Sequence, residues 1–297
     1  MKKKKNRASR RTSVRGACII ICASILFSIA FLLLRFLVSL TAGEQILLAF
    51  LETIVVLLLP AWIGLSGRGG LQIKAFHLAA VEPGKMALLF LTGLFVLFPM
   101  TLANEIAKTL LARFGIIPFR VEFTGDSFFF PSLLLYVLLR PISAALFYGE
   151  YLATSLGTRK LQYTQAVQIV LCTVQLGVYQ GFLPALIVSV LFVLCFYQSS
   201  SVVASILFFS GYGFGEMVFD RLLSFGSSPS RGPLISAFLI VGTLVEVFWL
   251  NRVWGIPAQR ERISLSGKLE FTKEERRLMI GTIVAVVAAI VVAEVLR

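Results

Sequence analysis

Two ionisable side chains, Arg140 and Glu150, lie inside an apolar stretch that is long enough to cross a bilayer. The stretch covers residues 131–156 and reads PSLLLYVLLRPISAALFYGEYLATSL. A charge at the centre of a hydrocarbon core costs about 2.5–3.5 kcal/mol on insertion scales, so such residues usually face the interior of a helical bundle and indicate a functional site. The plainer structural interpretation is that Arg140 pairs with a carboxylate from another span and that Pro141 kinks the helix.

A second group of polar side chains has the spacing of one helical face. Gln168, Cys172, Gln175 and Tyr179 follow one another at positions i, i+4, i+7 and i+11. Such a stripe in a membrane span should face neighbouring helices. Amide side chains do not titrate and are poor zinc ligands. The stripe therefore favours helix packing or substrate contact over acid–base chemistry.

Acidic residues occur in several apolar runs. Glu216 and Asp220 share one helical face, where a pair of carboxylates could bind a hard cation or relay protons. The alternative is that both are solvated at the membrane interface beside Arg221. Three further acids lie within apolar runs: Glu52, Glu105 and Glu246. Only Glu105 has a neighbouring base in the sequence, Lys108 three residues later.

The single histidine, His77, lies in a connecting segment between apolar runs. A zinc site built on histidine typically needs two or three imidazoles brought together with a carboxylate or a thiolate, and one histidine cannot supply that set. The sequence also has no glycine-rich phosphate loop, nucleophile elbow or cysteine pair with metal-binding spacing. We therefore expect no metal and no cofactor.

The composition predicts the fold class. Of 297 residues, 58% are hydrophobic and only 14% are charged, which is too few to cover a soluble surface of this size. The apolar runs are long and unbroken, which favours helices over a membrane β-barrel. We predict an all-α, polytopic membrane bundle formed as one domain over residues 17–297.

Nine apolar runs are candidate spans, and the fifth and sixth are short enough to be one broken or re-entrant hairpin, so we expect eight or nine membrane helices. The runs cover residues 17–40, 46–66, 86–111, 128–155, 166–178, 183–197, 202–219, 233–250 and 278–292. Arg35 lies near the end of the first run, where its long side chain can reach outward to the interface.

The charge distribution predicts the topology. Residues 1–16 form a basic arm with eight Lys and Arg and no acid, and the net charge of +13 gathers at the ends of apolar runs. This pattern indicates a cytoplasmic N-terminus and contact with anionic lipids, not nucleic-acid binding. We expect a multi-pass protein of the cell (plasma) membrane, in partnership with the lipid bilayer.

The order of these features resembles the CPBP family, the intramembrane metalloproteases that include the CAAX proteases. Residues 140–152, RPISAALFYGEYL, are similar to the region of the family's first motif, Glu-Glu-x-x-x-Arg. The glutamate pair of that motif falls on Ser143 and Ala144, or on Ala144 and Ala145, and its arginine falls on Tyr148. The resemblance covers residues 46–250 in layout.

Two later motifs of the family are matched in placement. The segment QLGVY, from Gln175 to Tyr179, is similar to Phe-x-x-x-His, with tyrosine at the histidine position. Residues 196–209 resemble the turn and helix that lead to His-x-x-x-Asn, where Phe209 takes the histidine position and Gly213 the asparagine position.

The resemblance implies the family's fold and a bacterial inner membrane location, but it does not carry over the activity. Alanine, tyrosine and phenylalanine at the motif positions cannot bind a metal or abstract a proton at neutral pH. We therefore expect a pseudoprotease without catalytic residues that binds a membrane peptide, a lipidated chain or a partner protein. Its cavity would be lined by the degenerate motif positions and their neighbours: Ser143, Ala144, Ala145, Tyr148, Glu150, Tyr151, Gln175, Tyr179, Phe209 and Gly213.

Two alternatives to a binding protein remain open. An active protease would need a displaced site built from the remaining acids: Glu150, Glu216, Asp220 and Glu246. A small-solute or ion transporter would use the intramembrane acids as an ion path, but the sequence has no inverted repeat that supports this class.

Overall fold

The computed structural model of the chain describes residues 14–66, 81, 83–112, 129–156, 161–180, 182–199, 201–225, 237, 239–245, 248, 277, 280, 281 and 284. These residues are almost entirely helical, and none of them lies in a β-strand. The predicted all-α class is therefore confirmed for this part of the chain. Residues 1–13 of the basic arm and most of the last two predicted spans lie outside it.

The chain begins with a helical hairpin. Helix α1 (Val14–Leu37) runs to a short turn, and α2 (Ala42–Glu52) returns alongside it, continued by the π-helical segment η2 (Thr53–Leu58) and by α3 (Leu59–Ser66). Glu44 closes the turn, because its carboxylate accepts hydrogen bonds from the backbone N–H and from the hydroxyl of Thr41, at 2.8 and 2.7 Å.

The predicted span 86–111 consists of two helices, α4 (Pro83–Phe95) and α5 (Leu97–Ala112), which meet at Val96. Pro99 has no backbone N–H, so it cannot donate to the carbonyl of Phe95 four residues earlier. The last residue of α4 is thus the one whose α-helical hydrogen bond is missing, which accounts for the break.

The span that contains Arg140 is one path of alternating α and π geometry. It consists of α6 (Phe129–Leu133), η5 (Leu134–Leu139), α7 (Arg140–Ala144), η6 (Ala145–Tyr151) and α8 (Leu152–Leu156). π-Helical turns inside membrane helices widen the backbone locally and occur frequently at functional sites.

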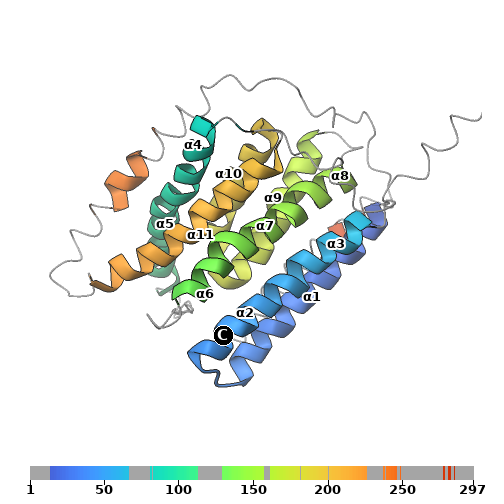
Figure 1. The fold of residues 1–297 in the computed structure, drawn as a ribbon, viewed down its shortest axis with the longest axis horizontal. Helices are drawn as coiled ribbons and strands as arrows, with labels where there is room; N and C mark the ends of the chain where they lie inside the picture. The colour runs from blue at the N-terminus through green and yellow to red at the C-terminus, as the bar shows by residue number, and fades with distance from the viewer. Residues whose placement is uncertain are drawn as a thin grey trace, which may run out of the picture.

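Three longer helices complete the described bundle. Helices α9 (Leu161–Gln180) and α10 (Phe182–Ser199) are separated by one residue and pack against each other as a hairpin, and α11 (Val202–Phe225) follows. In Figure 1 the hairpin of α1, α2 and α3 lies along one flank of the bundle and α4 with α5 along the other, with α7, α9, α10 and α11 between them.

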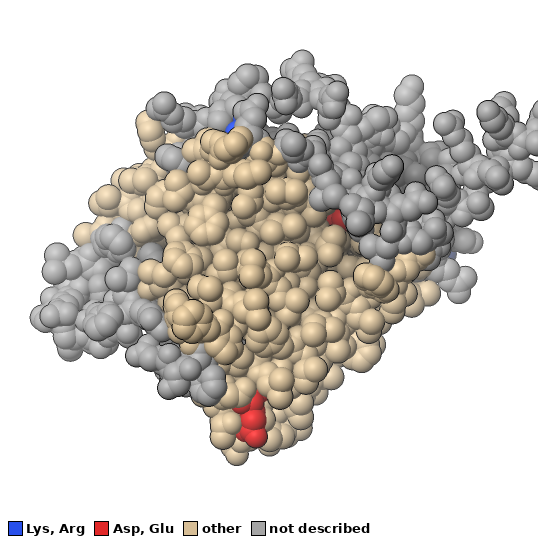
Figure 2. Space-filling model, in the orientation of Figure 1, with Lys and Arg blue, Asp and Glu red and all other residues tan. Residues whose placement is uncertain are grey.

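Within the part of the chain that the structure describes, four helical segments are long and apolar enough to cross a membrane: Cys18–Arg35, Ala42–Ser66, Pro83–Ala103 and Phe129–Tyr151. Many large apolar side chains of these segments are exposed, including Leu26, Leu47, Trp62 and Phe130. The described part of the face drawn in Figure 2 carries very few charged atoms. An apolar exterior of this extent indicates a membrane protein, whereas the count of eight or nine spans and the orientation of the N-terminus stay predictions.

Helix α11 occupies the middle of the bundle because its glycines allow backbones to touch. A Cβ atom at Gly211 would overlap the carbonyl oxygen of Phe90 in α4, and one at Gly93 of α4 would overlap that of Phe208 in α11. On the other side of α11, a Cβ at Gly213 would overlap the carbonyl oxygen of Tyr136 in η5. This close packing is what small residues provide in membrane bundles.

Candidate functional site

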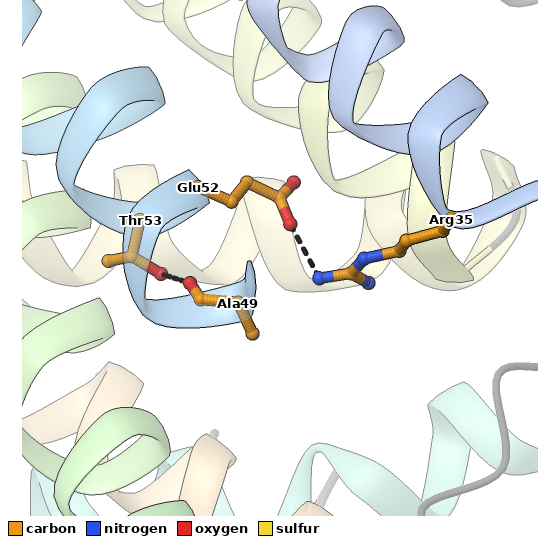
Figure 3. Close-up of polar contacts among 4 residues, drawn as sticks. All are labelled: Arg35, Ala49, Glu52 and Thr53. Atoms are coloured by element: carbon orange, nitrogen blue, oxygen red, sulfur yellow. Dashed lines mark hydrogen bonds and ion pairs between the residues drawn. The ribbon is translucent and has the colours of Figure 1, made fainter. Parts of the chain in front are cut away.

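An ion pair links the two helices of the first hairpin. The Nη2 atom of Arg35, in the last turn of α1, lies 2.7 Å from Oε2 of Glu52 in α2 (Figure 3). Glu52 is buried and Arg35 is partly buried. The expectation that Arg35 reaches outward to the interface is therefore wrong. Its side chain extends to the interior carboxylate, which would otherwise be costly in this apolar setting.

Arg140 is the next charge in this region. Its guanidinium carbon lies 5.6 Å from the ring centroid of Tyr136 one turn earlier, a cation–π contact. Arg140 also interacts electrostatically with Glu52 of α2 and with Glu216 of α11. The interpretation that Arg140 is balanced by a carboxylate from another span agrees with this placement.

The carboxylate of Glu216 completes the group. The hydroxyl of Tyr212, one turn earlier in α11, donates to Oε1 of Glu216 at 2.6 Å and lies 3.4 Å from the sulfur of Met100. Two arginines and two glutamates from α1, α2, α7 and α11 thus compensate one another, and we refer to Arg35, Glu52, Arg140 and Glu216 as the charge network. The side chain of Asp220 lies outside the described residues.

The charge network adjoins helix distortions that are stabilised by side chains from other helices. Pro141 follows Arg140 directly and cannot donate a backbone hydrogen bond to the carbonyl of Val137 in η5. The hydroxyl of Ser210 in α11 donates to that carbonyl oxygen at 2.8 Å. In lipid a backbone acceptor has no water to bind, so the serine supplies the donor that the proline lacks.

The same arrangement occurs after Glu52. Pro60 cannot donate to the carbonyl of Val56 in η2, and the hydroxyl of Ser24 in α1 donates to that oxygen at 2.7 Å. Two prolines in two different spans therefore each depend on a serine from a neighbouring helix. The sequence shows both prolines and both serines, but it does not show which serine reaches which carbonyl.

A glutamine performs this role at η6. The backbone N–H of Leu152 donates to the carbonyls of Phe147 and Gly149 and bypasses that of Tyr148. The side-chain amide of Gln168 in α9 donates to the Tyr148 carbonyl at 2.8 Å, and its oxygen accepts from the hydroxyl of Tyr197 in α10 at 2.6 Å. These contacts favour the packing interpretation of the polar stripe for Gln168.

The residues at the first motif position lie in the protein core. Ser143, Ala144, Ala145, Tyr148, Glu150 and Tyr151 are all buried. Phe209 is also buried, and its ring centroid lies 4.7 Å from that of Phe192, which in turn contacts Tyr148 at 6.4 Å. The structure thus brings Tyr148 and Phe209 into contact with the same phenylalanine. Gly213 lies in the same helix as Phe209 but is packed against η5.

The other two predicted cavity residues, Gln175 and Tyr179, belong to α9, and their side chains lie outside the described residues. Whether the ten positions line a cavity therefore stays a prediction. What the described members form is an aromatic cluster, which we define as Phe147, Tyr148, Tyr151, Phe192 and Phe209. Edge-to-face and stacked ring pairs of this kind stabilise a core beyond their buried area.

The chemistry available to these groups is limited. Aromatic rings and alanine methyl groups neither coordinate a metal nor accept a proton at neutral pH. Among the described residues, histidine, cysteine, aspartate and glutamate form no group of three or more that could hold a metal ion. The carboxylates of Glu52 and Glu216 are each engaged in a short contact, to Arg35 and to Tyr212.

Sequence reasoning missed the Arg35–Glu52 pair and the serine donors. Arg35 lies near the end of α1 and Glu52 at the end of α2. Counting residues from the turn would place Arg35 opposite the start of α2. The long arginine side chain nevertheless reaches Glu52. A proline inside an apolar run was the signal for a capped carbonyl, because each such proline leaves an acceptor that another helix must satisfy.

Comparison with protein-family models, curated proteins and solved structures finds no match to this chain. The resemblance to the CPBP family therefore stays a prediction that rests on the sequence alone.

Proposed function

We propose that this chain is a non-catalytic, multi-pass membrane protein that binds a membrane peptide, a lipidated chain or a membrane-embedded segment of a partner protein. The observation that supports the proposal is the contact of Phe192 with both Tyr148 and Phe209. Tyr148 and Phe209 stand where the resemblance places an arginine and a histidine, so the positions assigned to catalysis contribute ring packing instead.

Two of the acids that a displaced protease site would use have described side chains, Glu150 and Glu216. Glu216 would have to release the hydroxyl of Tyr212, which it holds at 2.6 Å, before it could activate a water molecule. Glu150 is buried beside the aromatic cluster. This arrangement supports a binding role over a hydrolytic one.

The proposal is tested with purified protein in lipid nanodiscs and two fluorescent probes. The first probe is an apolar transmembrane peptide of about 20 residues, the length that spans a bilayer. The second is the same peptide carrying a farnesylated C-terminal cysteine. Fluorescence anisotropy measures binding, and mass spectrometry reports whether each probe remains intact.

We expect saturable binding of at least one probe, with both probes intact after prolonged incubation. Empty nanodiscs of the same lipids provide the baseline for partition into the bilayer. Binding no stronger than that baseline for both probes contradicts the proposal. Cleavage of a probe by the wild-type protein that is lost in the variant Glu150→Gln contradicts it as well, and identifies an active protease.

A further inference from the structure

Three π-helical segments lie in the described part of the chain, η2, η5 and η6, and two of them lead up to a proline. Pro60 comes two residues after the end of η2, and Pro141 comes two residues after the end of η5. A proline has no backbone N–H, so the sequence itself prevents regular α-helical hydrogen bonding at these two places.

The third segment, η6, is not followed by a proline. The five residues after it form α8 (Leu152–Leu156), and none of them is proline. Leu152 has a backbone N–H, which in an α-helix would donate to the carbonyl of Tyr148 four residues earlier. It donates instead to the carbonyls of Phe147 and Gly149. Both partners of an α-helical bond are therefore present in η6, and the covalent structure does not force the π geometry.

A side chain from another helix occupies the carbonyl that Leu152 bypasses. The amide of Gln168 donates to the Tyr148 carbonyl at 2.8 Å, and the hydroxyl of Tyr197 donates to the amide oxygen of Gln168 at 2.6 Å. The second bond turns the NH₂ group of the amide toward η6. Gln168 is fully buried, so its amide depends on these two partners. We refer to Gln168 and Tyr197 as the amide clamp.

Relaxation of η6 to an α-helix would turn the chain on its two sides relative to each other. A π-turn holds one residue more than an α-turn, and one residue of α-helix corresponds to a rotation of about 100° and a rise of about 1.5 Å. The helix α8 and the end of η6 would therefore rotate by about this amount relative to α7, which precedes η6.

Tyr151, the last residue of η6, has contacts that depend on this rotation. Gly64 brings the backbone of α3 so close to Tyr151 that a Cβ there would overlap its ring. The ring of Tyr151 also stacks on that of Phe147, with 5.8 Å between the ring centroids and 26° between the ring planes. A rotation of about 100° would remove the ring from both contacts. The π geometry of η6 thus keeps Tyr151 in the aromatic cluster.

We propose that the amide clamp is a conformational device that holds η6 in its π geometry, and that its release lets this span relax to a continuous α-helix, which withdraws Tyr151 from α3. The clamp acts through hydrogen bonds within the chain and needs no partner. It therefore goes beyond the proposed binding function and is tested with the protein alone.

The experiment follows one fluorinated tyrosine at a time by ¹⁹F nuclear magnetic resonance in nanodiscs. The first probe replaces Tyr151 and reports whether its ring remains against Gly64. The second probe replaces Tyr136, which is also buried and lies in η5 of the same span, before η6. The two probes together distinguish a rotation that starts at η6 from a change of the whole span.

The test variant is Gln168→Leu, which removes both hydrogen bonds of the amide clamp and places an apolar side chain in the apolar interior. The matched control is Gln165→Leu, the same substitution three residues earlier in α9 at a partly buried position. A second test variant, Tyr197→Phe, removes only the hydroxyl that orients the amide and leaves Gln168 in place.

We expect Gln168→Leu to give a new Tyr151 resonance, with a population raised at least about tenfold over the control, and to leave the Tyr136 resonance unchanged. Tyr197→Phe should show the same new resonance as a minor species. The proposal is overturned if Gln168→Leu matches Gln165→Leu at Tyr151, or if both probes shift together, which indicates general loosening. If Gln168→Leu does not fold, Tyr197→Phe decides, and the lack of the new resonance in it overturns the proposal.

Discussion

The hydroxyl of Ser210 in α11 donates a 2.8 Å hydrogen bond to the carbonyl oxygen of Val137, the acceptor that Pro141 leaves without its α-helical donor. This bond joins helices that lie 73 residues apart in the chain. It lies one turn from Arg140 and beside the close contact of Gly213 with Tyr136. The serine therefore stabilises the backbone at the point where the span carries its charge.

Replacing this serine should destabilise the protein. We expect Ser210→Ala to lower the free energy of unfolding by about 1–2 kcal/mol, because a buried carbonyl loses its donor. The control is Thr92→Val, which removes a hydroxyl that bonds only within its own helix, to the carbonyl of Leu88. Unfolding in mixed detergent micelles measures both. An equal loss for the two variants contradicts the role assigned to Ser210.

The proline and the serine should show coupling. In the background Pro141→Ala, the new backbone N–H can donate to Val137, so Ser210→Ala should cost less than it does in the wild-type chain. We expect a coupling free energy of about 0.5–1 kcal/mol from the double-mutant cycle. Additive effects of the two substitutions would show that the serine does not compensate for the proline. The matched pair Pro60 and Ser24 should behave in the same way.

The close contact between α4 and α11 should not tolerate a methyl group. We expect Gly93→Ala to lower the free energy of unfolding by about 1–3 kcal/mol, because its Cβ would overlap the backbone of Phe208. Gly84→Ala in the same helix is the control, since a Cβ there meets nothing within 4 Å. Gly84→Ala should be neutral or slightly stabilising through its helix propensity. Similar thermal stability of the two variants would contradict the close packing.

Removing the hydrogen bonds of Gln168 one after the other should lower the stability of the protein in steps. Tyr197→Phe removes one hydrogen bond to Gln168, whereas Gln168→Leu removes that bond and the one to the Tyr148 carbonyl. We expect losses in the free energy of unfolding of about 0.5–1 and about 1–3 kcal/mol, respectively. The double variant should be no less stable than Gln168→Leu alone. Measurement by detergent unfolding of the three variants checks this order, and a larger loss for Tyr197→Phe would contradict it.

Replacing only Arg35 of the ion pair should destabilise the protein more than replacing both Arg35 and Glu52. Arg35→Gln leaves the buried carboxylate of Glu52 without its 2.7 Å partner, and we expect it to lower the free energy of unfolding by about 1–3 kcal/mol. Adding Glu52→Gln should restore part of this loss, because no uncompensated charge remains. A double variant that is less stable than Arg35→Gln in the same unfolding assay would show that the pair acts by more than charge balance.

The positions of the helices could be predicted from hydropathy, because lipid requires a long apolar run for each span. The break between α9 and α10 falls between the two short apolar runs, 166–178 and 183–197, that the sequence separates. The break at Val96 was not anticipated, although Pro99 carried the signal. A proline removes the hydrogen bond to the carbonyl four residues earlier, so the helix breaks near that earlier residue and not at the proline itself.

The partners of the charged and polar side chains could not be predicted in the same way. The sequence predicted that a carboxylate from another span balances Arg140. In the structure two acids interact electrostatically with it, Glu52 and Glu216. Helix order in the chain does not specify which helices become neighbours. Gly211 meets α4 and Gly213 meets η5, and which glycine meets which helix follows from the rotation of α11 in the bundle.

The shared hydrogen bonds also impose an order on synthesis. Ser24 leaves the ribosome 32 residues before the Val56 carbonyl that needs it, so the first hairpin can close as soon as its second arm is made. Ser210 is translated 73 residues after Val137. In the nascent chain the Val137 carbonyl therefore lacks its serine donor until α11 has been made, whereas the Val56 carbonyl has its donor from the start.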